Sequence, residues 1–77
     1  MQERIESALC NLREALDITR EDIVRRCDVS VGTVKNAERG QSLRKRSALQ
    51  ILGAINSFLQ EKQKPELTLN DLELKIS

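Results

Sequence analysis

The sequence contains no histidine, tryptophan or tyrosine, and Phe58 is its only aromatic residue. Without histidine the chain lacks the commonest general base and metal ligand, together with every nucleophile that histidine activates. The shortage of aromatic rings argues against binding single-stranded nucleic acid by base stacking. The carboxylates fall on expected helix caps and exposed faces, with no pair placed for acid–base catalysis. We therefore expect that the protein is not an enzyme.

Cysteines and long apolar runs are also scarce. Cys10 and Cys27 are the two cysteines, too few to complete a four-ligand zinc site in one chain. We expect both thiols to be reduced and to pack at helix edges, with a redox role as the alternative. No apolar run reaches the roughly 18 residues that cross a bilayer, and residues 1–7 show no signal-peptide pattern. These features predict a cytoplasmic protein with no cofactor, metal, membrane partner or small-molecule ligand.

The charge of the chain is balanced overall but unevenly distributed. The net charge of the 77 residues is +1, yet residues 20–46 carry eight basic and four acidic side chains. Residues 1–19 and 47–77 are each slightly acidic. A basic middle between acidic ends is typical of a face that meets phosphates. The alternative is an ordinary solvated surface on which the charges are scattered.

Apolar residues recur at helical spacing in four stretches, which predict helices at about 2–16, 20–27, 31–38, and from between 43 and 47 to about 62. The expected inward-facing residues are Ile5, Ala8, Leu9, Leu12, Leu16, Ile23, Val24, Cys27, Val34, Ala37, Ala48, Ile51, Leu52, Ile55, Phe58 and Leu59. The fourth stretch has the strongest periodicity. We expect one all-α domain of four to five short helices, small enough that oligomerisation can add stability.

Capping residues mark where these helices begin and end. Thr19 with Asp22 approaches a capping box, and Ser30 is placed to cap the third helix. Gly40 follows the third helix and suits a left-handed C-cap. Pro65 stops the fourth helix, since proline disfavours helix in the residue before it.

The chain divides into a domain at residues 1–62 and an apolar tail at residues 63–77. Thr68 and Asp71 can cap a single helical turn, whereas Leu72, Leu74 and Ile76 alternate like a strand. The tail holds too many apolar side chains for a frayed terminus. It is expected either to fold back on the first and fourth helices or to form a two-fold interface.

A short helix, a tight turn and a second short helix with a polar outer face constitute a helix-turn-helix. Residues 19–40, T-REDIVRRC-DVS-VGTVKNAERG, resemble the Cro/C1-type (lambda-repressor-like, XRE family) helix-turn-helix, and the resemblance extends over roughly residues 12–59. The residues that carry it are Ile23, Val29, Ser30, Val34, Glu38 and Gly40. The resemblance implies a bundle whose third helix enters the major groove of double-stranded DNA.

The resemblance also implies roles for individual side chains. The residues that it places at base edges are Val31, Gly32, Lys35 and Asn36. Those that it places at phosphates are Arg20, Ser30, Thr33, Arg44, Lys45 and Arg46. Arg13 and Glu38 match an ion pair that joins the first helix to the end of the third. Glycine lowers the stability of a helix relative to alanine. A close approach of the helix backbone to DNA would explain a glycine at position 32.

The chain departs from the family pattern in three respects. Asp28 stands where the family has a turn glycine, so we expect a left-handed backbone there. Val24 is larger, and Ala37 smaller, than the residues usual at the contact between the second and third helices. Arg20 stands in place of a glutamine that bonds to a phosphate, and its charge would strengthen that contact.

The function that follows from the resemblance is sequence-specific binding of double-stranded DNA by a transcriptional regulator, in a repressor-like homodimer on a pseudo-palindromic site. The residues expected at the dimer or partner surface are Phe58, Leu67, Leu69, Leu72, Leu74 and Ile76. The alternative is a protein-interaction adaptor or antitoxin-like module that uses the same fold. A DNA-binding protein needs its basic residues gathered on one face, whereas an adaptor does not.

Overall fold

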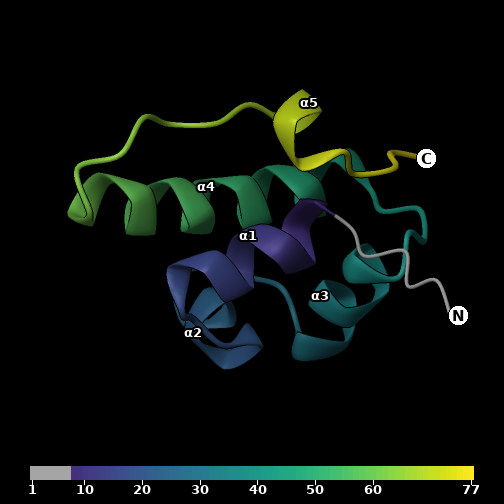
Figure 1. Cartoon of the computed structure of the whole chain (residues 1–77). Coiled ribbons are helices and arrows are strands. Elements are labelled where there is room, and N and C mark those ends of the chain that lie inside the picture. The colour runs from purple at the N-terminus through teal and green to yellow at the C-terminus, as the bar shows by residue number, and fades with distance from the viewer. Residues whose placement is uncertain (1–7) are drawn as a thin grey trace, which may run out of the picture.

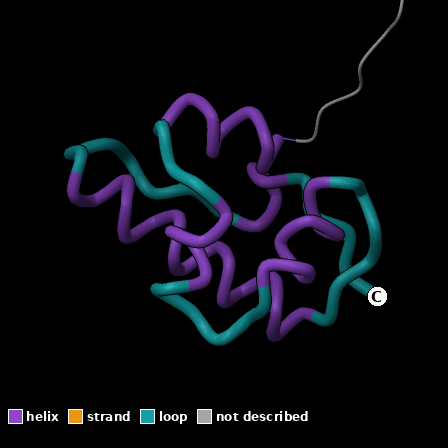
Figure 2. Tube along the Cα trace, turned by 90° about the horizontal axis from the view of Figure 1, so that it is seen from below, coloured by secondary structure: helices purple, strands orange, loops and turns teal. Residues whose placement is uncertain are grey.

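In a computed structural model of the protein, which describes residues 8–77, the chain folds as an all-α globule (Figure 1). Its five helices are α1 (Ala8–Leu16), α2 (Arg20–Val24), α3 (Val31–Glu38), α4 (Lys45–Glu61) and α5 (Leu69–Leu72). Loops join the helices within this part of the chain, with no strand between them (Figure 2). The all-α prediction is confirmed, and the part of the first predicted helix before residue 8 lies outside the described residues. No helix in residues 8–77 has the length and apolar character needed to cross a membrane.

Side-chain caps fix the starts of α2 and α3 where the sequence places them. Asp22 N–H donates to Thr19 Oγ1 at 3.1 Å, and Thr19 N–H donates to Asp22 Oδ2 at 2.8 Å. These bonds complete the capping box. The backbone hydrogen bond from Thr19 lowers the pKa of the Asp22 carboxyl below its ordinary value. Ser30 begins α3 in the same way, since its Oγ accepts from Thr33 N–H at 3.1 Å.

The second helix is shorter than predicted. It ends at Val24 instead of near residue 27, because the following N–H groups bond to carbonyls only three residues back. Arg26 N–H donates to the Ile23 carbonyl at 3.0 Å, and Cys27 N–H to the Val24 carbonyl at 3.4 Å. These bonds tighten the last turn and stop the α-helical ladder.

The left-handed conformation predicted for Asp28 is wrong. In residues 8–77 a positive φ occurs at Asp17, Gly40, Gln63 and Glu73. The tightened end of α2 already redirects the chain through right-handed conformations. Asp28 N–H then donates to Oε1 of Gln50 on α4 at 3.1 Å. A bond to a distant helix therefore holds this turn, and no glycine-like geometry is needed.

The end of α3 does follow the prediction for Gly40. Its φ is 82°, and its N–H donates to the Ala37 carbonyl at 3.1 Å. Gln41 N–H donates to the Asn36 carbonyl at 2.9 Å. These two bonds form a Schellman motif, in which a left-handed residue ends the helix and satisfies its last carbonyls.

Gln63 ends α4 with the same motif but without a glycine, at a φ of 57°. A left-handed conformation costs an ordinary residue about 1–2 kcal/mol and glycine almost nothing. We expect Gln63→Gly to raise the free energy of unfolding by about 0.5–1 kcal/mol, after the extra entropy of glycine in the unfolded chain is subtracted. Urea denaturation measures the change. Gln60→Gly, inside α4, is the control and should lower stability; equal losses in both variants would contradict the assignment.

The core gathers along α4. Ile51 and Ile55 are fully buried there, and Phe58 and Leu59 continue the same stripe. Ile23 and Val34 bring the short helices α2 and α3 against it. Leu52, also predicted to face inward, is half-buried. The helical periodicity therefore identifies the packed face of α4 correctly, and Leu52 lies at the edge of that face.

The tail folds back on the helices. After α4 the chain returns along that helix to α5, which lies against both α4 and α1 (Figure 1). Leu72 in α5 is 1% exposed. Asn56 holds the returning chain with two hydrogen bonds to the Leu67 backbone, at 2.8 and 3.0 Å. Beyond α5 the chain is extended and forms an isolated parallel bridge between Ile76 and Leu43. The capped turn predicted for the tail therefore forms as α5, whereas the strand-like alternation does not form from Leu72, which is helical, and only Ile76 makes a bridge.

Candidate nucleic-acid interface

The polar face of α3 is open to solvent. Val34 and Ala37 are 0% and 4% exposed and fix the helix against the core. The opposite face exposes Gly32, Lys35, Asn36 and Arg39, whose spacing of three and four residues places them on one side of the helix. Val31 and Thr33 are half-buried beside this face. Arg39 was not among the predicted contacts, although its position three residues after Asn36 in the same stripe is a signal that could have identified it.

Gly32 has no packing role within the described residues. A Cβ built there would meet only Ser30 Oγ, at 3.7 Å, which is ordinary van der Waals contact. The residue also lies inside a helix and has no positive φ. Packing within the described residues therefore does not require glycine at this position. A glycine here would instead let another molecule approach the backbone of α3 closely, because no side chain stands in the way.

Two of the predicted phosphate contacts, Ser30 and Thr33, take part in beginning α3. Ser30 Oγ caps the helix and lies 3.1 Å from Thr33 Oγ1. Ser30 is exposed beside the positive end of the helix dipole. Because Ser30 Oγ already accepts from Thr33 N–H, the same hydroxyl would bind an anion while it continues to cap the helix.

The other predicted phosphate contacts gather at the start of α4. Arg44, Lys45 and Arg46 are all exposed, and Arg44, the N-cap, makes no side-chain capping bond. A pocket of about 250 Å³ lies between this first turn and the turn before α3, lined by Asp28, Val29, Arg44, Arg46, Ser47 and Gln50. The arginines and the helix dipole make the pocket electropositive, while Asp28 opposes them.

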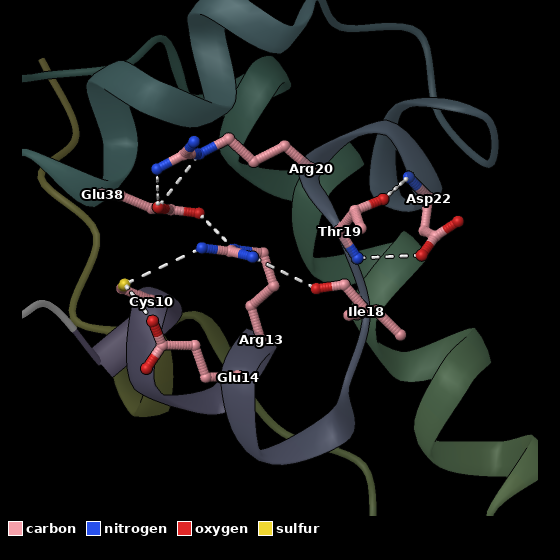
Figure 3. Close-up of polar contacts among 8 residues, drawn as sticks. All are labelled: Cys10, Arg13, Glu14, Ile18, Thr19, Arg20, Asp22 and Glu38. Atoms are coloured by element: carbon pink, nitrogen blue, oxygen red, sulfur yellow. Dashed lines mark hydrogen bonds and ion pairs between the residues drawn. The ribbon is translucent and has the colours of Figure 1, made fainter.

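Arg20 is engaged with a carboxylate of its own chain, although the sequence predicts that it contacts a phosphate. Arg20 Nη2 and Nε donate to Glu38 Oε1 at 2.9 and 3.2 Å. Arg13 Nε donates to the other oxygen of the same carboxylate at 2.8 Å. The two guanidinium groups thus share Glu38, which joins α1, α2 and α3 (Figure 3). No pattern in the sequence predicts that Arg20 pairs with a residue 18 positions away.

The cluster around Glu38 is partly buried. The Glu38 side chain is 4% exposed and that of Arg13 15%. Burial lowers the pKa of the Arg13 guanidinium, but its hydrogen bond and attraction to Glu38 outweigh burial and raise it overall. Arg13 also donates to the Ile18 carbonyl at 3.2 Å. Arg13 is therefore fixed in position, while the Arg20 side chain remains 35% exposed.

Ion pairs divide the arginines into two groups. Arg13, Arg20, Arg25 and Arg26 pair with carboxylates of the chain, in the last two cases with Asp22 and Glu61. Arg39, Arg44 and Arg46 pair with no carboxylate of residues 8–77. These three lie with Lys35 and Lys45 from the exposed face of α3 to the first turn of α4.

Arg26 fastens the end of α2 to α4. Its guanidinium lies 3.7 Å above the Phe58 ring centroid, and Nη1 lies 2.8 Å from Glu61 Oε2. Nη1 also donates to Ser57 Oγ at 3.0 Å. A cation over an aromatic face is stabilising, so Arg26 holds the end of α2 against α4.

Both cysteines are half-buried. Burial is the main cause that raises the pKa of the Cys10 and Cys27 thiols above their ordinary value. Cys27 Sγ donates to the Ile23 carbonyl at 3.3 Å and packs against the core. A raised thiol pKa disfavours the reactive thiolate at neutral pH.

The residues predicted at a dimer surface are distributed between core and exterior. Phe58 and Leu72 are 9% and 1% exposed, so in the single protomer both side chains lie in the core. Leu67, Leu69 and Leu74 are half-buried against the core. Ile76 is 42% exposed, and Leu49 on α4, which the prediction missed, is 47% exposed.

The fold is therefore a small all-helical domain, in which the arginines without a carboxylate partner in residues 8–77 lie between the end of α3 and the first turn of α4. Comparison of the chain with protein-family models, curated proteins and solved structures gives no significant match. The resemblance to the Cro/C1-type motif thus rests on the residues of the sequence alone.

Proposed function

We propose that the protein is a sequence-specific double-stranded DNA-binding regulator of the Cro/C1-type helix-turn-helix class. The observation that carries the proposal is the grouping of Arg39, Arg44 and Arg46, unpaired within residues 8–77, at the end of α3 and the start of α4. Basic side chains without carboxylate partners contribute most to phosphate binding, because no internal ion pair has to be broken. The exposed face of α3 beside them supplies the groups that read bases.

In the proposed complex α3 lies in the major groove. Asn36 bonds an adenine through its amide, and Lys35 donates to a guanine. Val31 contacts a thymine methyl group at the edge of the face. Gly32 allows the backbone of α3 to approach the DNA closely, in agreement with the finding that packing within residues 8–77 does not require glycine there. Arg44, Lys45 and Arg46 hold phosphates at the start of α4.

We further propose a homodimer on a pseudo-palindromic site, which represses by occupying promoter DNA. Two recognition helices about 34 Å apart match one turn of the duplex. The large apolar side chains available for contact between copies are Leu49 and Ile76, the two most exposed in residues 8–77.

Selection from a randomised duplex pool at two salt concentrations tests the proposal. The expected result is enrichment of a two-fold-symmetric sequence whose affinity falls as salt rises. Retention of no sequence above background would contradict DNA binding and favour the adaptor alternative, in which exposed Leu49 and Ile76 meet a partner protein. Enrichment of a single half-site would retain DNA binding and contradict the dimer.

Asn36→Ala should lose sequence preference at one base pair. Loss of a bidentate contact to a base costs about 1–3 kcal/mol, so affinity should fall for the selected site but little for a duplex already altered at that pair. Competition binding against single-base variants of the site measures this difference. Arg46→Ala is the control: it should weaken all the duplexes alike and reduce the salt slope. Unaltered base preference in Asn36→Ala would remove Asn36 from the reading face.

A further inference from the structure

The carboxylate of Glu38 has two cationic partners where one would neutralise it. Arg13 Nε bonds to Oε2 at 2.8 Å, and Arg20 bonds to Oε1 through both Nε and Nη2. The two arginines reach the carboxylate from different helices, and each approaches a different oxygen (Figure 3). The group of three therefore carries one surplus positive charge in the free protein.

The two arginines are not equally constrained. Arg13 is 15% exposed and is also bonded to the Ile18 carbonyl. Arg20 is 35% exposed, and within residues 8–77 its guanidinium bonds to Glu38 alone. Arg20 can therefore leave without stranding the charge of Glu38, because Arg13 continues to neutralise the carboxylate.

On this basis, and resting on the proposed DNA-binding function, we propose that Arg20 exchanges partners when DNA binds. In the free protein Arg20 is held by Glu38, and in the complex its guanidinium transfers to a backbone phosphate while Arg13 keeps Glu38 paired. A backbone phosphate has two non-bridging oxygens that can accept hydrogen bonds from a guanidinium, as the two oxygens of a carboxylate can. Glu38 is then a positioning residue, which holds the Arg20 side chain at the start of α2 in the free protein. Arg13 makes the exchange possible because it remains bonded to Glu38 after Arg20 has left.

The salt dependence of binding to a mixed-sequence duplex tests the exchange. Each phosphate contact adds about 0.9 to the slope of log affinity against log salt. Arg20→Gln and Arg44→Gln should therefore each flatten the slope by about one unit, and Arg20→Lys should retain the wild-type slope. Arg25→Gln is the matched control, because Arg25 lies at the end of the same short helix but is 75% exposed and paired with Asp22. The salt slope of this variant should equal that of the wild-type protein.

A direct measurement follows the guanidinium itself. In protein with ¹⁵N-labelled arginine, the Nε signal of Arg20 should shift on addition of the duplex, while that of Arg13 should stay in place. An Arg20 signal that does not move, together with an Arg20→Gln slope equal to that of wild type, would overturn the exchange and leave Arg20 as a structural partner of Glu38. If Arg44→Gln still flattens the slope in that case, the proposed function stands without the exchange. Salt-insensitive or absent binding by the wild-type protein would instead refute both.

Discussion

Glu38→Ala should lower the free energy of unfolding by about 3–5 kcal/mol, because removal of one member of a buried ion pair leaves the other charge without its partner. Glu38 is 4% exposed, and it is the shared acceptor for guanidinium groups from α1 and α2. After its removal Arg13, only 15% exposed, would retain bonds to the Ile18 carbonyl and Cys10 Sγ. A loss of this size is a large fraction of the total free energy of unfolding of a domain, which is typically about 5–15 kcal/mol. Urea denaturation followed by circular dichroism measures it.

Glu61→Ala is the matched control for this experiment. Glu61 also pairs with an arginine, Arg26, but its side chain is 62% exposed. Exposed ion pairs contribute at most about 1 kcal/mol, so the control should unfold near the wild-type midpoint. An unchanged melting temperature for Glu38→Ala would show that the three-helix contact contributes little to stability. The Glu38 variant should also bind DNA weakly at temperatures where it is partly unfolded, and recover on cooling.

The sequence predicts most of the fold because the determining signals are local. The spacing of Ile51, Ile55 and Phe58 identifies the inner face of α4, and the pairs Thr19–Asp22 and Thr68–Asp71 begin α2 and α5 where expected. Each of these signals involves residues that are close together in the sequence. The helix ends were less predictable: the turn after Val24 is closed by bonds three residues back, and the Asp28 backbone bonds to Gln50 on a distant helix.

The candidate site was predictable in its exposed face and in the Arg13–Glu38 ion pair, which the structure confirms, and unpredictable in the second partner of Glu38. Lys35 and Asn36 follow from the helical period of α3, and the same period extends to Arg39. The partner of Arg20 does not follow, because a single sequence does not tell whether an arginine reaches solvent or a carboxylate on another helix. Burial of the tail is a similar case: apolar residues at 67–76 indicate contact, but the surface that they contact depends on the tertiary fold.

Leu72→Ala should have the second large effect, a loss of about 2–5 kcal/mol in the free energy of unfolding. Leu72 is 1% exposed, and its helix α5 lies against α1 and α4, so truncation leaves a cavity between three helices. Ile76→Ala is the control, since Ile76 is 42% exposed and its truncation should cost much less in a monomer.

The dependence on protein concentration decides what the tail does. If Leu72 stabilises the protomer from within, the loss in Leu72→Ala is the same at low and high protein concentration. If the tail instead held two copies together, the midpoint would rise with concentration in the wild type and that rise would disappear in Leu72→Ala. The burial of Leu72 and the two backbone bonds from Asn56 to Leu67 favour the first result. A concentration-dependent midpoint that only Ile76→Ala abolishes would place the dimer contact at the exposed end of the tail and leave Leu72 in the core.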